Sequence, residues 1–277
     1  MKQLLLFLAM ALISVVEVVA QLEVVGSGES QRCFGGGDRM VSVLISNRSD
    51  KVLSLEALMR LVQTSSATAI RLSEAPWKKL EVSPKQTVVE RALISIPVVG
   101  AETRFLVQWW EGTNKVFGTT EVLVYPTNLL AQFKVLAGEA AMGVFDPANQ
   151  LKPLLRTLAV EFQDLIEDGT DKFRGKLAIF GPFGSKEQIR ESLADDIRAL
   201  AKRGVAVVWL QPLSESRSSL KASFYTVRMG NGSVVVAQGE MVLRLSENPQ
   251  AQLNLIRLAE MALHPEPLNL PETRNAN

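Results

Sequence analysis

The sequence predicts two domains: an N-terminal all-β, Ig-like sandwich over residues 21–126, followed by an α/β, doubly wound and mostly parallel sheet over residues 127–264. Two observations predict this division. Up to residue 125, runs of β-branched and apolar residues alternate with clusters of Gly, Pro, Asn, Asp and Ser, which is the pattern of strands and turns. From Pro126 onward, short apolar strands alternate with helical segments, as in parallel sheets that are covered by helices on both faces.

The first domain is expected to hold about seven short strands, in the proportions of an Ig-like sandwich. A turn cluster at residues 47–50 separates two of these strands, and residues 111–114 form a hairpin loop between the last two. Residues 53–61 are also compatible with a helix, so this element keeps two interpretations. The clearest strand-forming runs cover residues 40–46, 52–62, 86–96, 104–110 and 115–125.

The second domain alternates helices with short apolar strands, the first of which ends at Asp146. The right-handed crossover rule makes a flavodoxin-like layout the simplest topology for this alternation. The expected helices cover residues 128–136, 150–158, 186–203 and 250–263, and the expected strands cover residues 141–145, 160–162, 176–180, 205–210, 223–227 and 233–238.

The helix over residues 186–203 carries the clearest start and stop signals. Ser185 and Gln188 have the spacing of a capping box, in which the two side chains bind each other's backbone amides. An apolar stripe along this segment would face the sheet. Gly204 can adopt the left-handed conformation that ends a helix.

The N-terminus predicts a signal peptide over residues 1–20. A positive start is followed by an apolar run over residues 4–16, and Val18 and Ala20 are the small residues expected before a cleavage site. The run is too short for the roughly 30 Å hydrocarbon core of a membrane. We therefore expect an exported chain, periplasmic or extracellular, with no integral span after cleavage; a retained N-terminal anchor is the alternative. Residues 265–277 predict a Pro-rich extended tail.

Composition excludes several classes of function. The formal net charge is +1 and both halves are balanced, so neither has the basic excess of a nucleic-acid binder. The chain has one histidine, His264, and one cysteine, Cys33, so no metal site and no cofactor are expected. Cys33 lacks a lipidation signal and cannot form an intramolecular disulfide. We interpret it as an inert thiol in an N-terminal strand.

Candidate ligand-binding residues lie where strands of the second domain end, because ligands of doubly wound sheets bind outside the carboxyl ends of the strands. A phosphate loop requires Gly-Lys-Ser/Thr, whereas residues 184–186 read Gly-Ser-Lys, so a tight turn is the preferred interpretation. The acidic pair at residues 195–196 is interpreted as a solvated mid-helix face rather than a glycosidase pair. The candidates are Asp146, Gly181, Phe183, Gly184, Ser185 and Gln211.

Tryptophans supply one further candidate. Trp109 and Trp110 are adjacent on a predicted strand, so their side chains face opposite sides. One is expected in the core, and the other, taken as Trp110, could stack on a sugar or anchor a partner protein. Trp209 is expected in the core of the second domain.

The strand, Gly-Pro-Phe turn and capped helix around residues 176–203 resemble the class I glutamine-amidotransferase-like fold, as do residues 232–237 followed by residues 247–252 and a helix. The nearest likeness is to non-catalytic versions of this domain in exported bacterial proteins, and it covers residues 128–264. Catalytic members place a nucleophilic cysteine at the strand-to-helix elbow and a His-Glu pair downstream. Here the elbow holds Gly181, Pro182 and Phe183, so the resemblance implies a pseudoenzyme and no catalytic residue.

These observations lead to an exported, non-enzymatic binding or scaffolding protein with a degenerate amidotransferase-like domain. Its partner would be a protein or a glycan of unknown identity. The alternative is an exported hydrolase that acts on carbohydrate through carboxylates that the sequence does not bring together. An interaction subunit with its interface near Pro126 is a third hypothesis.

Overall fold

The computed structural model describes residues 22–26, 30–212 and 224–265. The chain separates into two compact units. Of the described residues, the N-terminal unit comprises 22–26, 30–31 and 35–124, and the C-terminal unit comprises Arg32–Phe34, 125–212 and 224–265. The predicted signal peptide, the start of the strand expected at residue 223 and the tail beyond Pro265 lie outside the described residues.

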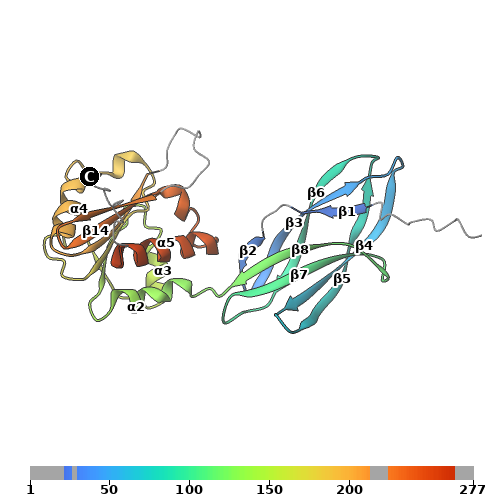
Figure 1. Ribbon diagram of the computed structural model, residues 1–277, viewed down its shortest axis with the longest axis horizontal. Coiled ribbons are helices and arrows are strands. Elements are labelled where there is room, and N and C mark those ends of the chain that lie inside the picture. Colours follow the sequence, from blue (N-terminus) through green and yellow to red (C-terminus); the bar gives the residue numbers. More distant parts are fainter. Residues whose placement is uncertain (1–21, 27–29, 213–223, 266–277) are drawn as a thin grey trace, which may run out of the picture. The chain divides into compact units, whose positions relative to one another are not determined.

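The described part of residues 22–125 forms two sheets, one of three strands in the order β1-β3-β6 and one of five in the order β2-β8-β7-β4-β5 (Figure 1). The pairings within the first sheet, and those from β8 to β5 in the second, are antiparallel. Residues 53–61 lie within a strand and not in a helix. Strand β5, which contains Pro76 and several charges, was not predicted from the sequence. The strands are β1 (Leu22–Val25), β2 (Gln31–Phe34), β3 (Gly37–Asn47), β4 (Leu53–Thr64), β5 (Ala69–Val82), β6 (Thr87–Ile96), β7 (Thr103–Glu111) and β8 (Lys115–Tyr125).

Alternation along these strands decides which side chains form the core. In β6, Ala92, Ile94 and Ile96 are buried while the residues between them are exposed, which is the period-two pattern of a sheet with one buried face. In β7, Phe105 and Trp109 are fully buried in the same way. The predicted core position of one of the two adjacent tryptophans is therefore confirmed for Trp109.

The C-terminal unit holds one six-stranded sheet in the order β10-β9-β11-β12-β14-β13. Neighbouring strands are parallel except for β13, which runs antiparallel to β14 at the edge. The strands are β9 (Met142–Phe145), β10 (Phe162–Asp164), β11 (Leu177–Phe180), β12 (Ala206–Gln211), β13 (Phe224–Met229) and β14 (Gly232–Gln238). The helices are η1 (Leu129–Gln132), α2 (Phe133–Ala137), α3 (Lys152–Thr157), η2 (Lys186–Gln188), α4 (Leu193–Lys202), η3 (Gly239–Val242) and α5 (Pro249–Leu263).

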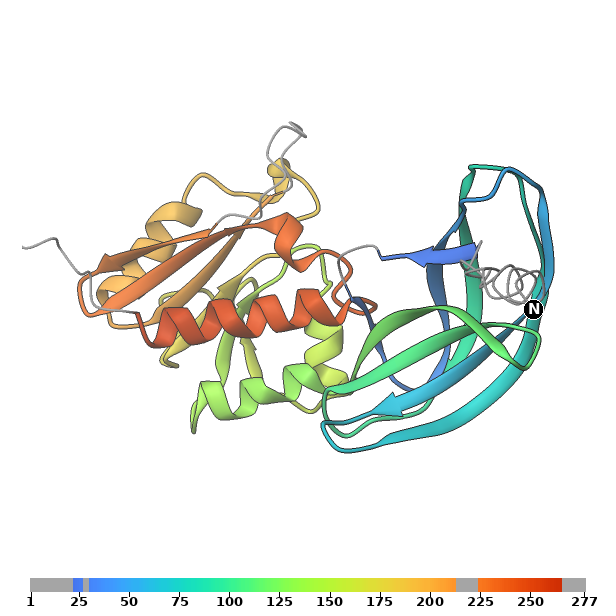
Figure 2. The ribbon, with the colours of Figure 1, turned by 45° about the vertical axis from the view of Figure 1, so that its right-hand side comes forward.

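Helices α4 and α5 cover opposite faces of this sheet (Figures 1 and 2). The face toward α4 buries Phe180, Val207 and Val236 with Leu193 and Ile197 of that helix. On the other face, the Ser233 hydroxyl donates a hydrogen bond to the carbonyl of Ala262 in α5. Strands β9 and β11 are buried at every position because helices or loops cover both of their faces.

The fold class predicted from the sequence is wrong. The chain is α/β with mixed sheets, and the structure does not show a distinct all-β, Ig-like N-terminal domain. Its sheets of three and five strands differ from the four and three of an Ig constant-type sandwich. In addition, Arg32–Phe34, which belong to strand β2, group with the C-terminal unit. The predicted Ig-like domain required about seven short strands, whereas β4 and β5 run for 12 and 14 residues.

The predicted helix over residues 186–203 is also wrong in extent. A short 3-10 turn, η2, ends at Gln188, and Ile189 has an extended backbone with a ψ of 107°. The long helix begins only at Leu193. Asp195 and Asp196 therefore lie in its first turn rather than mid-helix, where their charges favour the N-terminal end of the helix dipole.

Candidate functional site

Six of the predicted ligand-binding residues lie along one edge of the C-terminal sheet. Strands β9, β11 and β12 are parallel neighbours, so the residues that follow them meet at their common carboxyl end. Asp146 follows β9, the turn at residues 181–185 follows β11, and Gln211 ends β12. This is the edge at which open α/β sheets bind ligands, and the state of each group there decides what it can do.

Asp146 is buried, with 1% of its surface exposed. Its carboxylate accepts hydrogen bonds from the amides of Gln150, Leu151 and Lys152 at 3.1, 2.7 and 2.9 Å. The amides of Leu151 and Lys152 lie at the start of helix α3 and would otherwise lack partners, because the first turn of a helix has no intrahelical acceptors. The amide of Gln150 directly precedes them. Asp146 is thus an acceptor for the start of a helix, and its oxygens are directed at the protein's own backbone.

The turn after β11 is packed against its neighbours. The amide of Gly181 donates to the carbonyl of Phe145 at 2.7 Å. Gly181 has a φ of +104°, and a Cβ there would lie 3.0 Å from the Cβ of Leu210, so glycine is required for conformation and for space. Phe183 is 4% exposed, and its ring centroid lies 6.2 Å from that of Phe145. The aromatic side chain fills the turn from the inside.

The predicted capping box at Ser185 does not form. The Ser185 hydroxyl makes no capping hydrogen bond. Instead it donates to the carboxylate of Glu187, and this hydrogen bond lowers the pKa of Glu187. The Gln188 side chain accepts a hydrogen bond from the amide of Gly184 at 2.6 Å. That amide, which a phosphate loop would direct at an anion, is thereby occupied.

A buried ion pair at the same edge was missed by the sequence analysis. The Lys152 Nζ in α3 lies 2.7 Å from the Asp164 Oδ2 at the end of β10, and both side chains are 11% exposed. Burial alone would raise the pKa of Asp164. The hydrogen bond from Lys152, the amides of Ile166 and Glu167 and the Lys152 charge outweigh it and hold the pKa below 3.8. No spacing in the sequence predicts this pair, because its two residues come from different elements, α3 and the three-residue strand β10.

We expect Asp164→Asn to destabilise the protein by about 2 kcal/mol near pH 7, because it removes the buried partner of Lys152. The folded-state pKa of Asp164 is lowered, so its contribution to stability is present above the unfolded value of about 3.9 and is lost as the pH falls through the folded value. Urea midpoints of both proteins at about pH 7 and about pH 3 test this. The exposed Asp168→Asn is the control. An equal midpoint difference at both pH values would contradict the expectation.

The other candidates occupy different environments. Gln211 is half-buried and in register with Gln238 on β14. Trp209, expected in the core, is only partly buried against the α4-side cluster, and its buried indole Nε1 has no hydrogen-bond partner among the described residues.

Trp110 lies in the N-terminal unit, on the face of β7 that points away from the core. The guanidinium of Arg60 lies 3.6 Å from the centre of its indole ring, a cation–π contact. The indole nitrogen donates to Gln108 at 3.3 Å. One face of the ring is therefore covered by a protein cation, which leaves less of it for stacking on a sugar.

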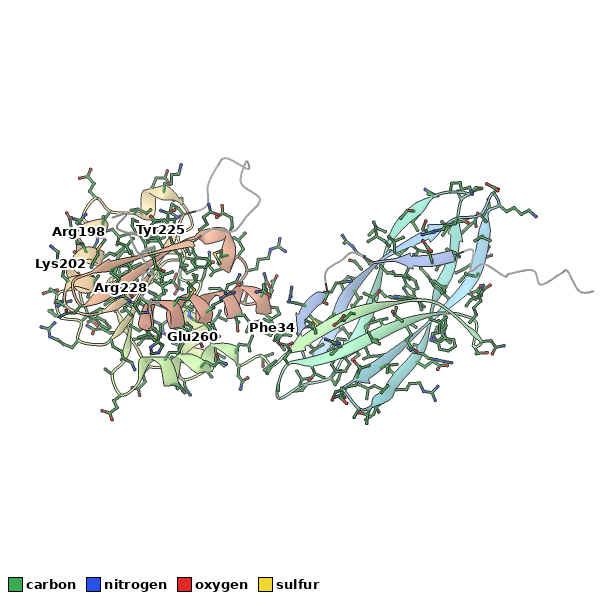
Figure 3. The ribbon with its side chains drawn as sticks, in the orientation of Figure 1. Phe34, Arg198, Lys202, Tyr225, Arg228 and Glu260 are labelled. Carbon is green, nitrogen blue, oxygen red and sulfur yellow. The ribbon has the colours of Figure 1, made fainter. Side chains whose placement is uncertain are left out.

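A groove of about 790 Å³ lies elsewhere in the C-terminal unit, between the edge strand β13 and helix α5. Arg228 on β13 donates to the carbonyl of Pro265 at 2.9 Å. Figure 3 labels Arg228 and Glu260, which come from these two elements. His264 follows α5, and the composition of the groove is amphipathic. Its lining residues are Leu136, Thr226, Arg228, Arg257, Glu260, Met261, His264 and Pro265.

Comparisons with known proteins give no family. No family model matches the chain, and no curated protein matches it. A solved structure of the alkylpurine DNA glycosylase AlkC from Pseudomonas fluorescens matches with 10% identity over 38% of this chain and 30% of that one, at a TM-score of 0.28. Spo0M, a sporulation control protein from Bacillus subtilis, matches with 8% identity over 42% and 55%, at 0.29.

A β-glucosidase from Kluyveromyces marxianus matches with 11% identity over 38% of this chain and 14% of that one, at a TM-score of 0.26. The chain thus spans less than two thirds of each of these proteins. Scores this low transfer neither a fold nor an activity. The resemblance to the glutamine-amidotransferase-like family stays a prediction. No helix within the described ranges is both long enough and apolar enough to cross a lipid bilayer.

Proposed function

We propose that the chain is an exported, non-enzymatic binding or scaffolding protein. The observation that carries the proposal is the state of Asp146. It is a carboxylate at the expected ligand edge, and its oxygens accept hydrogen bonds from three backbone amides. A general acid or base must reach a substrate proton within hydrogen-bond distance, and a carboxylate bound in this way is directed elsewhere.

The neighbouring groups support the same conclusion. Asp164 is held by Lys152 and by the amide of Ile166. Two glycosidase carboxylates must face each other across an open cleft at about 5–9.5 Å, with their oxygens available to sugar or water. The carboxylate oxygens of Asp146 and Asp164 instead accept hydrogen bonds from groups of the same chain. The hydrolase alternative therefore gains no support from this edge.

The export part of the proposal rests on the sequence of residues 1–20 alone. Expression of the full chain in a bacterial host tests both parts together. We expect the protein in the exported fraction, with the mass of a chain that starts at Gln21. We expect it to hydrolyse chromogenic glycosides, esters and amides no faster than buffer alone does. Hydrolysis that Asp146→Asn or Asp164→Asn abolishes, in a protein that remains folded, would contradict the proposal. Protein retained in the cytoplasm would contradict the export part only.

A further inference from the structure

The sheet β1-β3-β6 carries exposed apolar side chains on the face that points away from the core. In β3 and β6, residues such as Val41 and Ala92 are buried, so alternation directs their neighbours outward. Met40 and Leu93 are direct partners in the register of these strands and are 57% and 56% exposed. Val89, on the same side of β6, is 64% exposed. Apolar side chains that gather on one exposed face indicate an interaction surface.

Two charges of opposite sign lie on this outer face, which comprises the alternate residues 38–46 of β3 and 87–95 of β6. Asp38 and Arg91 are the charged members of this set, and both are exposed. Neither of them forms an ion pair with another residue in the described ranges. A partner that covers the face would therefore have to offer one cation and one anion.

The two charges lie at matching distances from the apolar centre. Asp38 comes two residues before Met40 in β3, and Arg91 comes two residues before Leu93 in β6. Because β3 and β6 are antiparallel and Met40 is in register with Leu93, the two charges lie on opposite sides of that pair. A half-turn about a line that crosses both strands at this pair therefore exchanges the level of Asp38 with the level of Arg91.

This symmetry fits a second copy of the chain. Two sheets pack face to face about 10 Å apart, with their strands within roughly 30° of each other. The half-turn then sets Met40 and Leu93 of one copy against the same residues of the other. Arg91 of one copy comes within one strand spacing, about 4.8 Å, of the position that faces Asp38 of the other. Each copy makes the same contacts, so the pair closes as a two-fold dimer.

The charges also select this orientation of the two copies. A half-turn about a line parallel to the strands would place Asp38 beside the Asp38 of the other copy and Arg91 beside its Arg91. Like charges at such distances disfavour association. In the orientation that crosses the strands, like charges are four residues apart along the strand, which is roughly 13 Å.

The contact lies away from the parts of the N-terminal unit that the structure does not describe. Residues 1–21 and 27–29 adjoin β1 in the chain, and β1 pairs with residues 44–47 of β3. Strand β6 lies on the other side of β3 from β1 (Figure 1). A chain that starts at Gln21 retains every residue of the contact.

We propose that the outer faces of β3 and β6 from two copies of the chain pack against each other in a two-fold dimer. Met40 and Leu93 form its centre, and the contacts between Asp38 and Arg91 fix its orientation. Two strands of about ten residues present roughly 10 Å by 33 Å of surface. This area is smaller than the roughly 800 Å² per partner of a standard interface, so the dimer forms reversibly with concentration. The proposal goes beyond the proposed binding function and does not depend on it.

Sedimentation equilibrium of the full chain between about 1 and 300 μM tests the dimer. We expect a monomer–dimer equilibrium that Leu93→Glu weakens at least about tenfold. Ile70→Glu is the matched control, because Ile70 is 55% exposed on β5 of the other sheet, and it should leave the equilibrium unchanged. A chain that starts at Gln21 should dimerise equally well.

Three outcomes of this measurement would overturn the proposal. The first is a monomer throughout the concentration range. The second is a dimer that Leu93→Glu does not weaken. The third is a dimer that is lost when residues 1–20 are removed, which would assign the contact to that segment.

Charge reversal tests the orientation of the two copies. Asp38→Arg and Arg91→Asp should each weaken dimerisation by about tenfold, because each places like charges together. The double variant restores opposite charges and should return the dissociation constant to within about threefold of the unchanged value. A defect in folding would not be repaired in this way. Single reversals without effect, or a double variant that is no better than either single one, would overturn the proposal.

Discussion

Asp146→Ala should destabilise the protein by about 3 kcal/mol, because it leaves the buried amides of Leu151 and Lys152 and the part-buried amide of Gln150 without an acceptor. Every helix that the structure describes lies at residue 129 or beyond, so far-UV circular dichroism during urea unfolding reports on this region. The midpoint should fall without a change in the shape of the native spectrum.

Asp146→Asn is the matched control. It keeps one side-chain oxygen as an acceptor and should lose roughly half as much stability. A structural role predicts this graded loss of stability. Full stability in Asp146→Ala together with loss of a binding or hydrolytic activity would instead assign the carboxylate to an open functional site.

Gly232→Ala should cost about 3 kcal/mol or more, because the new Cβ would lie 2.5 Å from two backbone carbonyl oxygens, those of Ala201 and Val205. Gly232 begins β14 opposite Met229 of β13. The backbone at this point cannot move without disturbing the hairpin that forms the edge of the sheet. We therefore expect a lower urea midpoint.

Gly184→Ala provides the comparison. The group nearest to a Cβ at Gly184 would be the side chain of Gln188, at 3.4 Å. The free energy of unfolding of this variant should stay within about 0.5 kcal/mol of that of the unchanged protein. Equal stability of Gly232→Ala and Gly184→Ala would contradict the close approach of β14 to the turn between α4 and β12.

Sequence patterns predicted the local elements correctly where the buried positions are also a run of apolar residues. The four residues of β9 and of β11 are all buried and read as uniform apolar runs. Strand β5 was missed because an exposed edge strand shows no apolar alternation and contains Pro76. The helix at residue 186 was misjudged because a capping box and an apolar stripe do not reveal the extended Ile189 that interrupts them.

The candidate site shows the same limit. The topology rule brought Asp146, Gly181 and Gln211 to one edge, but it could not predict that the amides after Asp146 would turn back to its carboxylate. The Lys152–Asp164 pair joins residues from α3 and β10, and the groove joins β13 to α5. Such pairings depend on how elements pack, and no local spacing in the sequence encodes them.

Hydrogen–deuterium exchange of the unchanged protein and of Asp146→Ala tests most directly the claim that the carboxyl edge is occupied by the chain's own groups. The account predicts slow exchange at the amides of Leu151 and Lys152 in the unchanged protein, and faster exchange at both in the variant. Exchange at these two amides that is equally fast in both proteins would contradict it.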